Sequence, residues 1–113
     1  MILFFQQSNT LFYAVHTLSE QPASDIDKLK WLFGNAQFLS VQIIEGHFIG
    51  PRKEMITPWS TNAVEITQNM GIADVKRIEE FYKVSSNKES FDPMLQAMYH
   101  GLDQHIFTIE KQP

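Results

Sequence analysis

The part of the sequence that most strongly predicts a fold spans residues 51–72 and reads PRKEMITPWSTNAVEITQNMGI. Pro58 suits the first turn of a helix, where its missing N–H would have no helical partner in any case. Thr57 or Ser60 can act as the N-cap, and Gly71 stands where a left-handed C-terminal cap is expected. The apolar residues recur at helical spacing and predict a buried stripe on this helix: Trp59, Ala63, Ile66 and Met70.

Other apolar runs along the chain are rich in strand-forming residues, and they predict the strands Ile2–Phe5, Leu11–Leu18, Glu45–Ile49 and Val75–Val84. In the last of these runs, Glu79 and Glu80 interrupt the alternation and indicate a bulge. Residues 37–44 fit either a strand or a short helix.

Two more helices are predicted on either side of these strands. Ser24 and Asp27 fit a capping box for a helix that buries one face and ends at the left-handed pair Gly34-Asn35. The face consists of Ile26, Leu29, Leu32 and Phe33. A third helix is expected from about Pro93, with a stripe that fits the core better than a partner surface: Met94, Met98, Leu102 and Ile106.

Together these elements predict an α+β fold, with an antiparallel-type sheet covered by helices. Each half of the chain has a helix followed by an extended run, which allows a duplicated strand–helix–strand unit. With 113 residues, of which 43% are hydrophobic, the chain has enough material for a single domain over residues 1–113. Residues 108–113 resemble the start of a linker.

Composition argues against several classes of partner. The net charge is −4 and the nine Lys and Arg residues are scattered, whereas a nucleic-acid binder concentrates them in a patch. The absence of cysteine excludes disulfides and thiolate sites in this chain. The apolar start lacks a charged region and is too short for a signal peptide, and no later run could cross a membrane. A cytoplasmic protein with no nucleic-acid or membrane partner is expected.

A search for catalytic groups predicts no catalytic residue and no metal site. His100 and His105 lie five residues apart on a predicted helix and would point about 140° apart. Glu79 and Glu80 point to opposite faces of a strand, and no serine lies in a nucleophile motif. Arg52 and Lys53 precede a helix N-terminus, which suits an anion. A capped helix with Trp59 in the core and Arg52 in solvent is the favoured alternative.

The segment from Gly50 to Ile78 resembles part of the large phosphoribosylformylglycinamidine synthases. In that family a strand ends in Pro-Arg, a Ser-Pro-Trp-Ser-Ser-Lys-Ala-Thr motif follows, and a helix ends in Asn-Cys-Gly-Leu before a strand that contains an Arg. Thr57, Asn62 and Met70 depart from this pattern. The positions that match it are Pro51, Arg52, Pro58, Trp59, Ser60, Ala63, Ile66, Asn69, Gly71 and, in the next strand, Arg77.

The resemblance implies that this chain is the N-terminal accessory domain of a larger enzyme, similar to a fused pair of small accessory subunits. That enzyme makes the amidine of formylglycinamide ribonucleotide in purine biosynthesis, with glutamine as nitrogen donor and with ATP and Mg²⁺. Its synthetase and glutaminase domains would be the partners, and this domain would help couple ammonia release to its use. No cofactor is expected in this fragment.

By this resemblance, Arg52, Trp59, Ser60 and Asn69 are candidates for the domain interface. Arg52 and the helix N-terminus are expected to contact an acidic or phosphate-bearing surface. The alternative is a free-standing α+β module for protein interaction or ligand sensing.

Overall fold

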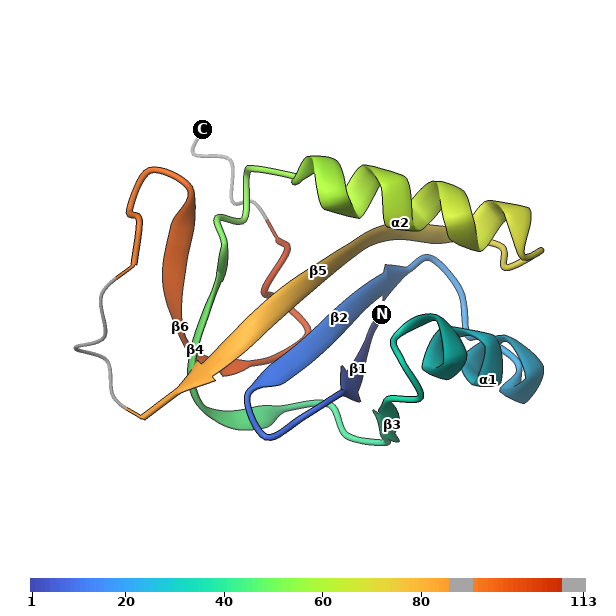
Figure 1. Cartoon of the computed structure of the whole chain (residues 1–113), viewed down its shortest axis with the longest axis horizontal. Coiled ribbons are helices and arrows are strands. Elements are labelled where there is room, and N and C mark those ends of the chain that lie inside the picture. Colours follow the sequence, from blue (N-terminus) through green and yellow to red (C-terminus); the bar gives the residue numbers. More distant parts are fainter. Residues whose placement is uncertain (86–90, 109–113) are drawn as a thin grey trace.

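The computed structural model describes residues 1–85 and 91–108 and contains one six-stranded sheet with two helices (Figure 1). The elements are β1 (Ile2–Gln6), β2 (Leu11–Thr17), α1 (Ala23–Leu32), β3 (Gln37–Leu39), β4 (Ile44–Pro51), α2 (Pro58–Asn69), β5 (Val75–Val84) and β6 (Gln96–Leu102). The strand order is β3-β1-β2-β5-β4-β6, and all neighbouring strands are antiparallel. The predicted α+β class is therefore confirmed.

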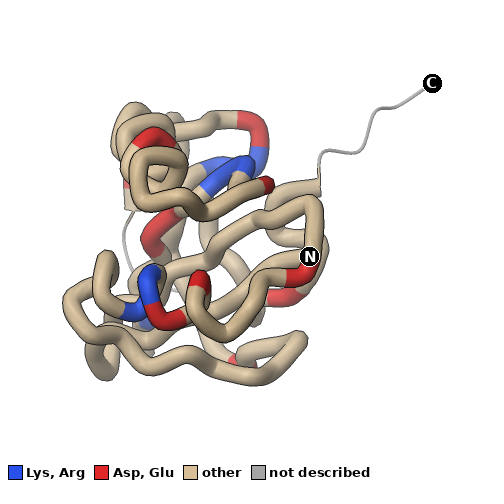
Figure 2. Tube along the Cα trace, turned by 90° about the vertical axis from the view of Figure 1, so that its right-hand side faces the viewer, with Lys and Arg blue, Asp and Glu red and all other residues tan. Residues whose placement is uncertain are grey.

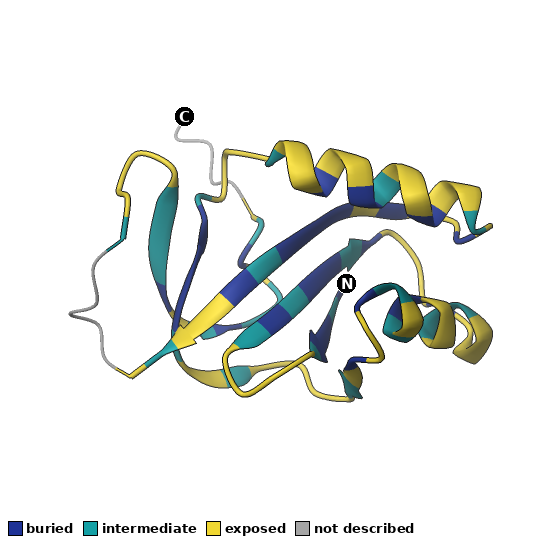
Figure 3. Cartoon of the chain, in the orientation of Figure 1, coloured by how far each residue is buried: buried dark blue, intermediate teal, exposed yellow. Residues whose placement is uncertain are grey.

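The two helices cover the same face of the sheet. Leu29 of α1, Phe33 at the C-cap of that helix and Ala63 of α2 pack in one buried cluster with Val15 and Ile78. The sides of both helices that face away from the sheet are exposed (Figure 3).

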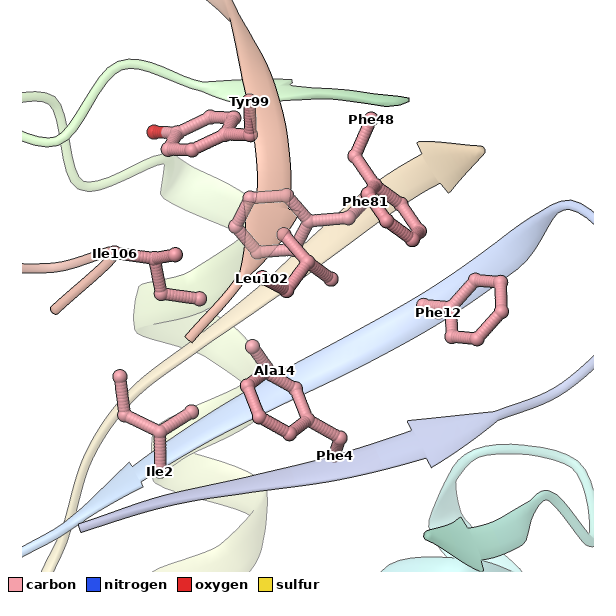
Figure 4. Packing of buried hydrophobic residues seen from close by; sticks show 9 residues of the cluster. All are labelled: Ile2, Phe4, Phe12, Ala14, Phe48, Phe81, Tyr99, Leu102 and Ile106. Carbon is pink, nitrogen blue, oxygen red and sulfur yellow. The ribbon is translucent and has the colours of Figure 1, made fainter. Parts of the chain in front are cut away.

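The opposite face of the sheet forms a second buried cluster, to which five of the six strands contribute aromatic rings (Figure 4). Phe12 and Phe48 meet edge to face, with ring centroids 5.3 Å apart. The segment after β6 covers part of this face, since Ile106 belongs to the cluster and Phe107 packs against it. The Gln104 side chain, just after the edge strand β6, hydrogen-bonds both the N–H and the C=O of Ile2 in β1.

Helix α2 begins and ends as the sequence predicts, and the Thr57 Oγ1 accepts a 3.0 Å hydrogen bond from the Ser60 N–H as its N-cap. The predicted buried stripe is confirmed for Ala63, and Met70 packs against the core, but it is wrong for Trp59 and Ile66, which are 40% and 44% exposed. Small residues face the sheet instead, because α2 lies close along β5. They are Ser60, Ala63 and Thr67.

The predicted capping box of α1 is also wrong. The N-cap of this helix is Pro22, and no side chain caps it. The predicted end is confirmed, because Gly34 and Asn35 both adopt left-handed conformations with φ of 73° and 62°. The ambiguous residues 37–44 contain the short strand β3.

The third predicted helix is wrong, because residues 96–102 form the edge strand β6. Met94 is 75% exposed, while Leu102 is fully buried. Spacings of four residues are even numbers, so they suit the two-residue repeat of a strand as well as a helix. Gly101 adopts a φ of 89° beside an irregularity in the pairing of β4 with β6, and this backbone favours glycine.

The bulge predicted at Glu79 and Glu80 lies elsewhere. Both residues pair regularly with β2, and the register shifts between His16 and Thr17. The duplicated unit is not confirmed, because the first half of the chain runs β-β-α-β and the second half β-α-β-β. Of the predicted linker start, residues 109–113 lie outside the described residues.

Candidate functional site

Residues 51–60 run from the end of β4 to the first turn of α2 and contain half of the positions that match the family motif; they are here called the motif loop. Its conformation depends on Arg77 of β5, whose guanidinium donates to three backbone carbonyls of the loop. The distances are 3.2 Å to the oxygen of Arg52, 2.6 Å to that of Lys53 and 3.0 Å to that of Met55. The same guanidinium lies 4.5 Å from the centre of the Phe107 ring.

The fourth hydrogen bond of Arg77 goes to Glu79, also on β5, at 2.8 Å from Nε to Oε2. The two side chains are only 6% and 1% exposed, so the ion pair is buried. A buried charge is tolerated only when it is paired and hydrogen-bonded. The loop carbonyls and Thr57 supply the additional bonds that satisfy this pair.

Glu79 also occupies the N-terminus of α2. Its carboxylate accepts a hydrogen bond from the Thr57 N–H at 3.2 Å and from the Thr57 hydroxyl at 2.7 Å. A helix N-terminus attracts negative charge because of its unpaired N–H groups and its dipole. Here the protein's own carboxylate supplies that charge, and the cap and the ion pair form one unit.

Two further hydrogen bonds fix the ends of the motif loop. The Ser60 hydroxyl accepts from the Ile78 N–H at 3.0 Å, which joins α2 to β5. The Tyr99 hydroxyl of β6 donates to the Pro51 carbonyl. Burial, as the largest cause, raises the pKa of Tyr99 to about 12, so the phenol stays a donor at physiological pH.

The outer side of the motif loop is accessible. Arg52 is 42% exposed and pairs with Glu54 at 2.5 Å, so an anionic partner would have to compete with this carboxylate. Met55, Ile56 and Trp59 are 37%, 59% and 40% exposed. Exposed apolar side chains and an exposed arginine are typical of interaction surfaces.

Arg52 and Trp59 open onto different hollows. Arg52, Lys53 and Glu54 line a hollow of about 430 Å³ together with residues of β6. Trp59 lines another, of about 200 Å³, between the two helices, where its ring stacks 5.9 Å from that of Tyr13. The motif loop therefore presents two separate surfaces.

The predicted site residues fall into two groups. Arg52, Trp59 and Asn69 are accessible, whereas the side chain of Ser60 is 0% exposed and serves the fold of this domain. The alternative favoured for this segment was a capped helix with Trp59 in the core. The helix is capped, but Trp59 does not lie in the core. Sequence reasoning missed the role of Arg77 and Glu79, although the resemblance already included Arg77.

Charged groups elsewhere form small clusters of both signs along the chain (Figure 2). Within residues 1–85 and 91–108, no group of three or more His, Cys, Asp or Glu side chains is placed to hold a metal ion. In the same described ranges, neither helix is long and apolar enough to cross a membrane.

A family model described as formylglycinamide ribonucleotide amidotransferase N-terminal matches residues 10–107. The chain belongs to this family. The name denotes the phosphoribosylformylglycinamidine synthases that the motif resembles, so the match confirms that resemblance and extends it beyond the motif. No curated protein and no solved structure matches the chain significantly. The residues that match this amidotransferase N-terminal family include the whole motif loop, both helices and β5. It connects the chain to an enzyme of purine biosynthesis.

Proposed function

We propose that this chain is the non-catalytic accessory domain of a formylglycinamide ribonucleotide amidotransferase. It packs on the synthetase and glutaminase domains of the same enzyme in the cytoplasm and helps couple ammonia release to ammonia use. ATP, Mg²⁺ and the glutamine-hydrolysing cysteine belong to those other domains. The parent reaction is an ATP-dependent ligation with glutamine as nitrogen donor.

The family match over residues 10–107 is the observation on which this proposal rests. The motif loop also supports the proposal, because the polar side chains that hold the loop in place already have hydrogen-bond partners within this domain. Thr57 and Ser60 bond to β5, and Glu79 pairs with Arg77. Several side chains of the loop remain accessible, among them Arg52 and Trp59, and these suit contact with a neighbouring domain better than chemistry.

The test uses the full-length enzyme and measures turnover with glutamine and with ammonia separately. If the motif loop helps couple the two sites, Arg52→Ala or Trp59→Ala lowers the glutamine-dependent rate and leaves the ammonia-dependent rate near that of the wild type. Since the two residues line separate hollows, the comparison also identifies which surface faces the partner.

Matched controls are available for both substitutions. Lys76→Ala removes an exposed cation from β5, and Trp31→Ala removes a tryptophan that is 68% exposed on α1. If Arg52→Ala and Trp59→Ala both behave like these controls with either nitrogen source, the coupling role of the loop is wrong.

The alternative of a free-standing interaction or sensing module is tested by the coding sequence downstream of Pro113. Continuation into an ATP-binding synthetase region and a cysteine-dependent glutaminase would support the accessory domain. A nearby stop codon would favour the free-standing module.

A further inference from the structure

Two histidines that lie 53 residues apart in the sequence face each other across β4 and β6. His47 and His100 are register partners in the antiparallel pairing. Their Nδ1 atoms are 3.3 Å apart, and the rings meet edge to face with centroids 5.3 Å apart. His47 is half-buried and His100 is exposed, so solvent ions reach the pair.

The separation of the two nitrogens equals an edge of a zinc coordination tetrahedron. Zn²⁺ binds imidazole nitrogen at about 2.0–2.1 Å, and tetrahedral angles then place two ligand nitrogens about 3.3–3.4 Å apart. Imidazole is also the side chain that borderline divalent ions such as Zn²⁺ and Cu²⁺ prefer. We propose that His47 and His100 form a two-ligand site for a divalent transition-metal ion, with Zn²⁺ as the ion that the geometry fits.

The backbone around the pair is irregular where the histidines need to converge. Gly46, beside His47, has a φ of 129°, and Gly101, beside His100, has a φ of 89°. The pairing of β4 with β6 shifts register between Ile44 and His47. β4 is hydrogen-bonded to strands on both sides, so the position of His47 is set by the sheet. Ligands on paired strands lose little freedom when the ion binds.

Among residues 1–85 and 91–108, these two histidines are not joined by a third histidine, cysteine or carboxylate that could complete the site. The two remaining positions on the ion are therefore filled by water or by a donor from a bound molecule. Because a structural zinc site has four protein ligands, this site binds more weakly and exchanges its ion. Binding the ion cross-links β4 to the edge strand β6.

The same geometry also fits a hydrogen bond between two neutral imidazoles, and metal binding distinguishes the two cases. The metal-free 113-residue chain is titrated with ZnCl₂ by calorimetry at pH 7.5. The site takes one Zn²⁺ per chain, and His47→Asn or His100→Asn weakens binding by about tenfold or more. The loss is this large because the second imidazole binds an ion that is already held beside it. His105→Asn, a matched change near the end of the described chain, leaves the affinity unchanged.

Cu²⁺ provides a second measurement that needs no variant. Its electron paramagnetic resonance spectrum at one equivalent shows two imidazole nitrogens, and a spectrum with one would contradict the site. The proposal is wrong if Zn²⁺ does not bind below about 1 mM, or if His47→Asn and His100→Asn bind it as well as the wild type. The pair is then a hydrogen bond alone.

Discussion

Replacing Glu79 with glutamine is the most direct test of the buried ion pair under the motif loop. Oε2 of Glu79 accepts from Arg77 and from the Thr57 N–H, and Oε1 accepts from the Thr57 hydroxyl. A glutamine oxygen in place of Oε2 keeps the first two bonds, and the Thr57 hydroxyl can turn to accept from the amide. Glu79→Gln therefore removes the charge and the acceptor of the Thr57 hydroxyl proton, and leaves the Arg77 guanidinium buried without its counterion.

The expected cost follows from the burial of both partners, which are 6% and 1% exposed. Removing one partner of a buried pair costs about 3–5 kcal/mol. The three loop carbonyls still solvate the guanidinium, so we expect the lower end, about 3 kcal/mol. This is a large part of the roughly 5–15 kcal/mol that stabilises a typical domain.

Urea unfolding of the 113-residue chain, followed by the fluorescence of Trp31 and Trp59, measures this loss. Glu80→Gln is the matched control, because Glu80 is half-buried and its partner is the exposed Tyr82 hydroxyl at 3.2 Å. Its cost is expected to stay within about 0.5 kcal/mol. Equal effects of the two substitutions, or a change below about 1 kcal/mol for Glu79→Gln, would refute the reasoning.

Three further predictions concern the packing around the loop and the closure of the sheet. Gly50→Ala places a Cβ 2.4 Å from the Phe81 ring, and this overpacking should lower the free energy of unfolding in urea by about 1–3 kcal/mol. Gly34→Ala is the comparison, because its Cβ would make only ordinary contacts and the strain there comes from the backbone alone. Gln104→Ala removes the two hydrogen bonds to Ile2 that close the curled sheet and should cost about 1–3 kcal/mol; thermal unfolding measures it, and an unchanged midpoint would contradict the closure. The pKa of Tyr99, raised to about 12 from about 10 in the unfolded chain, contributes stability that is complete below pH 10 and falls as the pH rises toward 12. Tyr99→Phe should flatten this fall, and equal slopes in urea unfolding at pH 9–11.5 would contradict it.

Much of the fold follows from local signals, and the errors come from contacts distant in sequence. The ends of α2 depend on Pro58, Thr57 and Gly71, which act within one turn, so the sequence predicts them. The buried face of α2 depends on which side lies against β5, which no local signal specifies. In β6, the spacing from Met98 to Leu102 satisfies a strand and a helix equally, and pairing with β4 decides the outcome.

The candidate site shows the same division. Arg52 and Trp59 could be identified because the family motif marks them within a short stretch. The hydrogen bonds of Arg77 to the loop span 22 to 25 residues, and nothing in the local pattern predicts them. The His47–His100 pair was missed for a related reason, because His100 was assigned to a helix and compared only with His105.

Burial also determines how variants of the motif are to be interpreted. Ser60 matches the family motif, yet its hydroxyl accepts from Ile78 and has no exposed surface. Ser60→Ala would therefore lower turnover in the full-length enzyme through the stability of this domain, with glutamine and ammonia affected alike. Arg52→Ala removes a solvent-exposed ion pair with Glu54, and exposed pairs contribute little to stability, so the fold should survive. A glutamine-specific defect in a variant that unfolds at the wild-type urea concentration is thus the result that assigns a partner contact. Among the accessible motif residues, Arg52 and Trp59 are the positions where it should be sought.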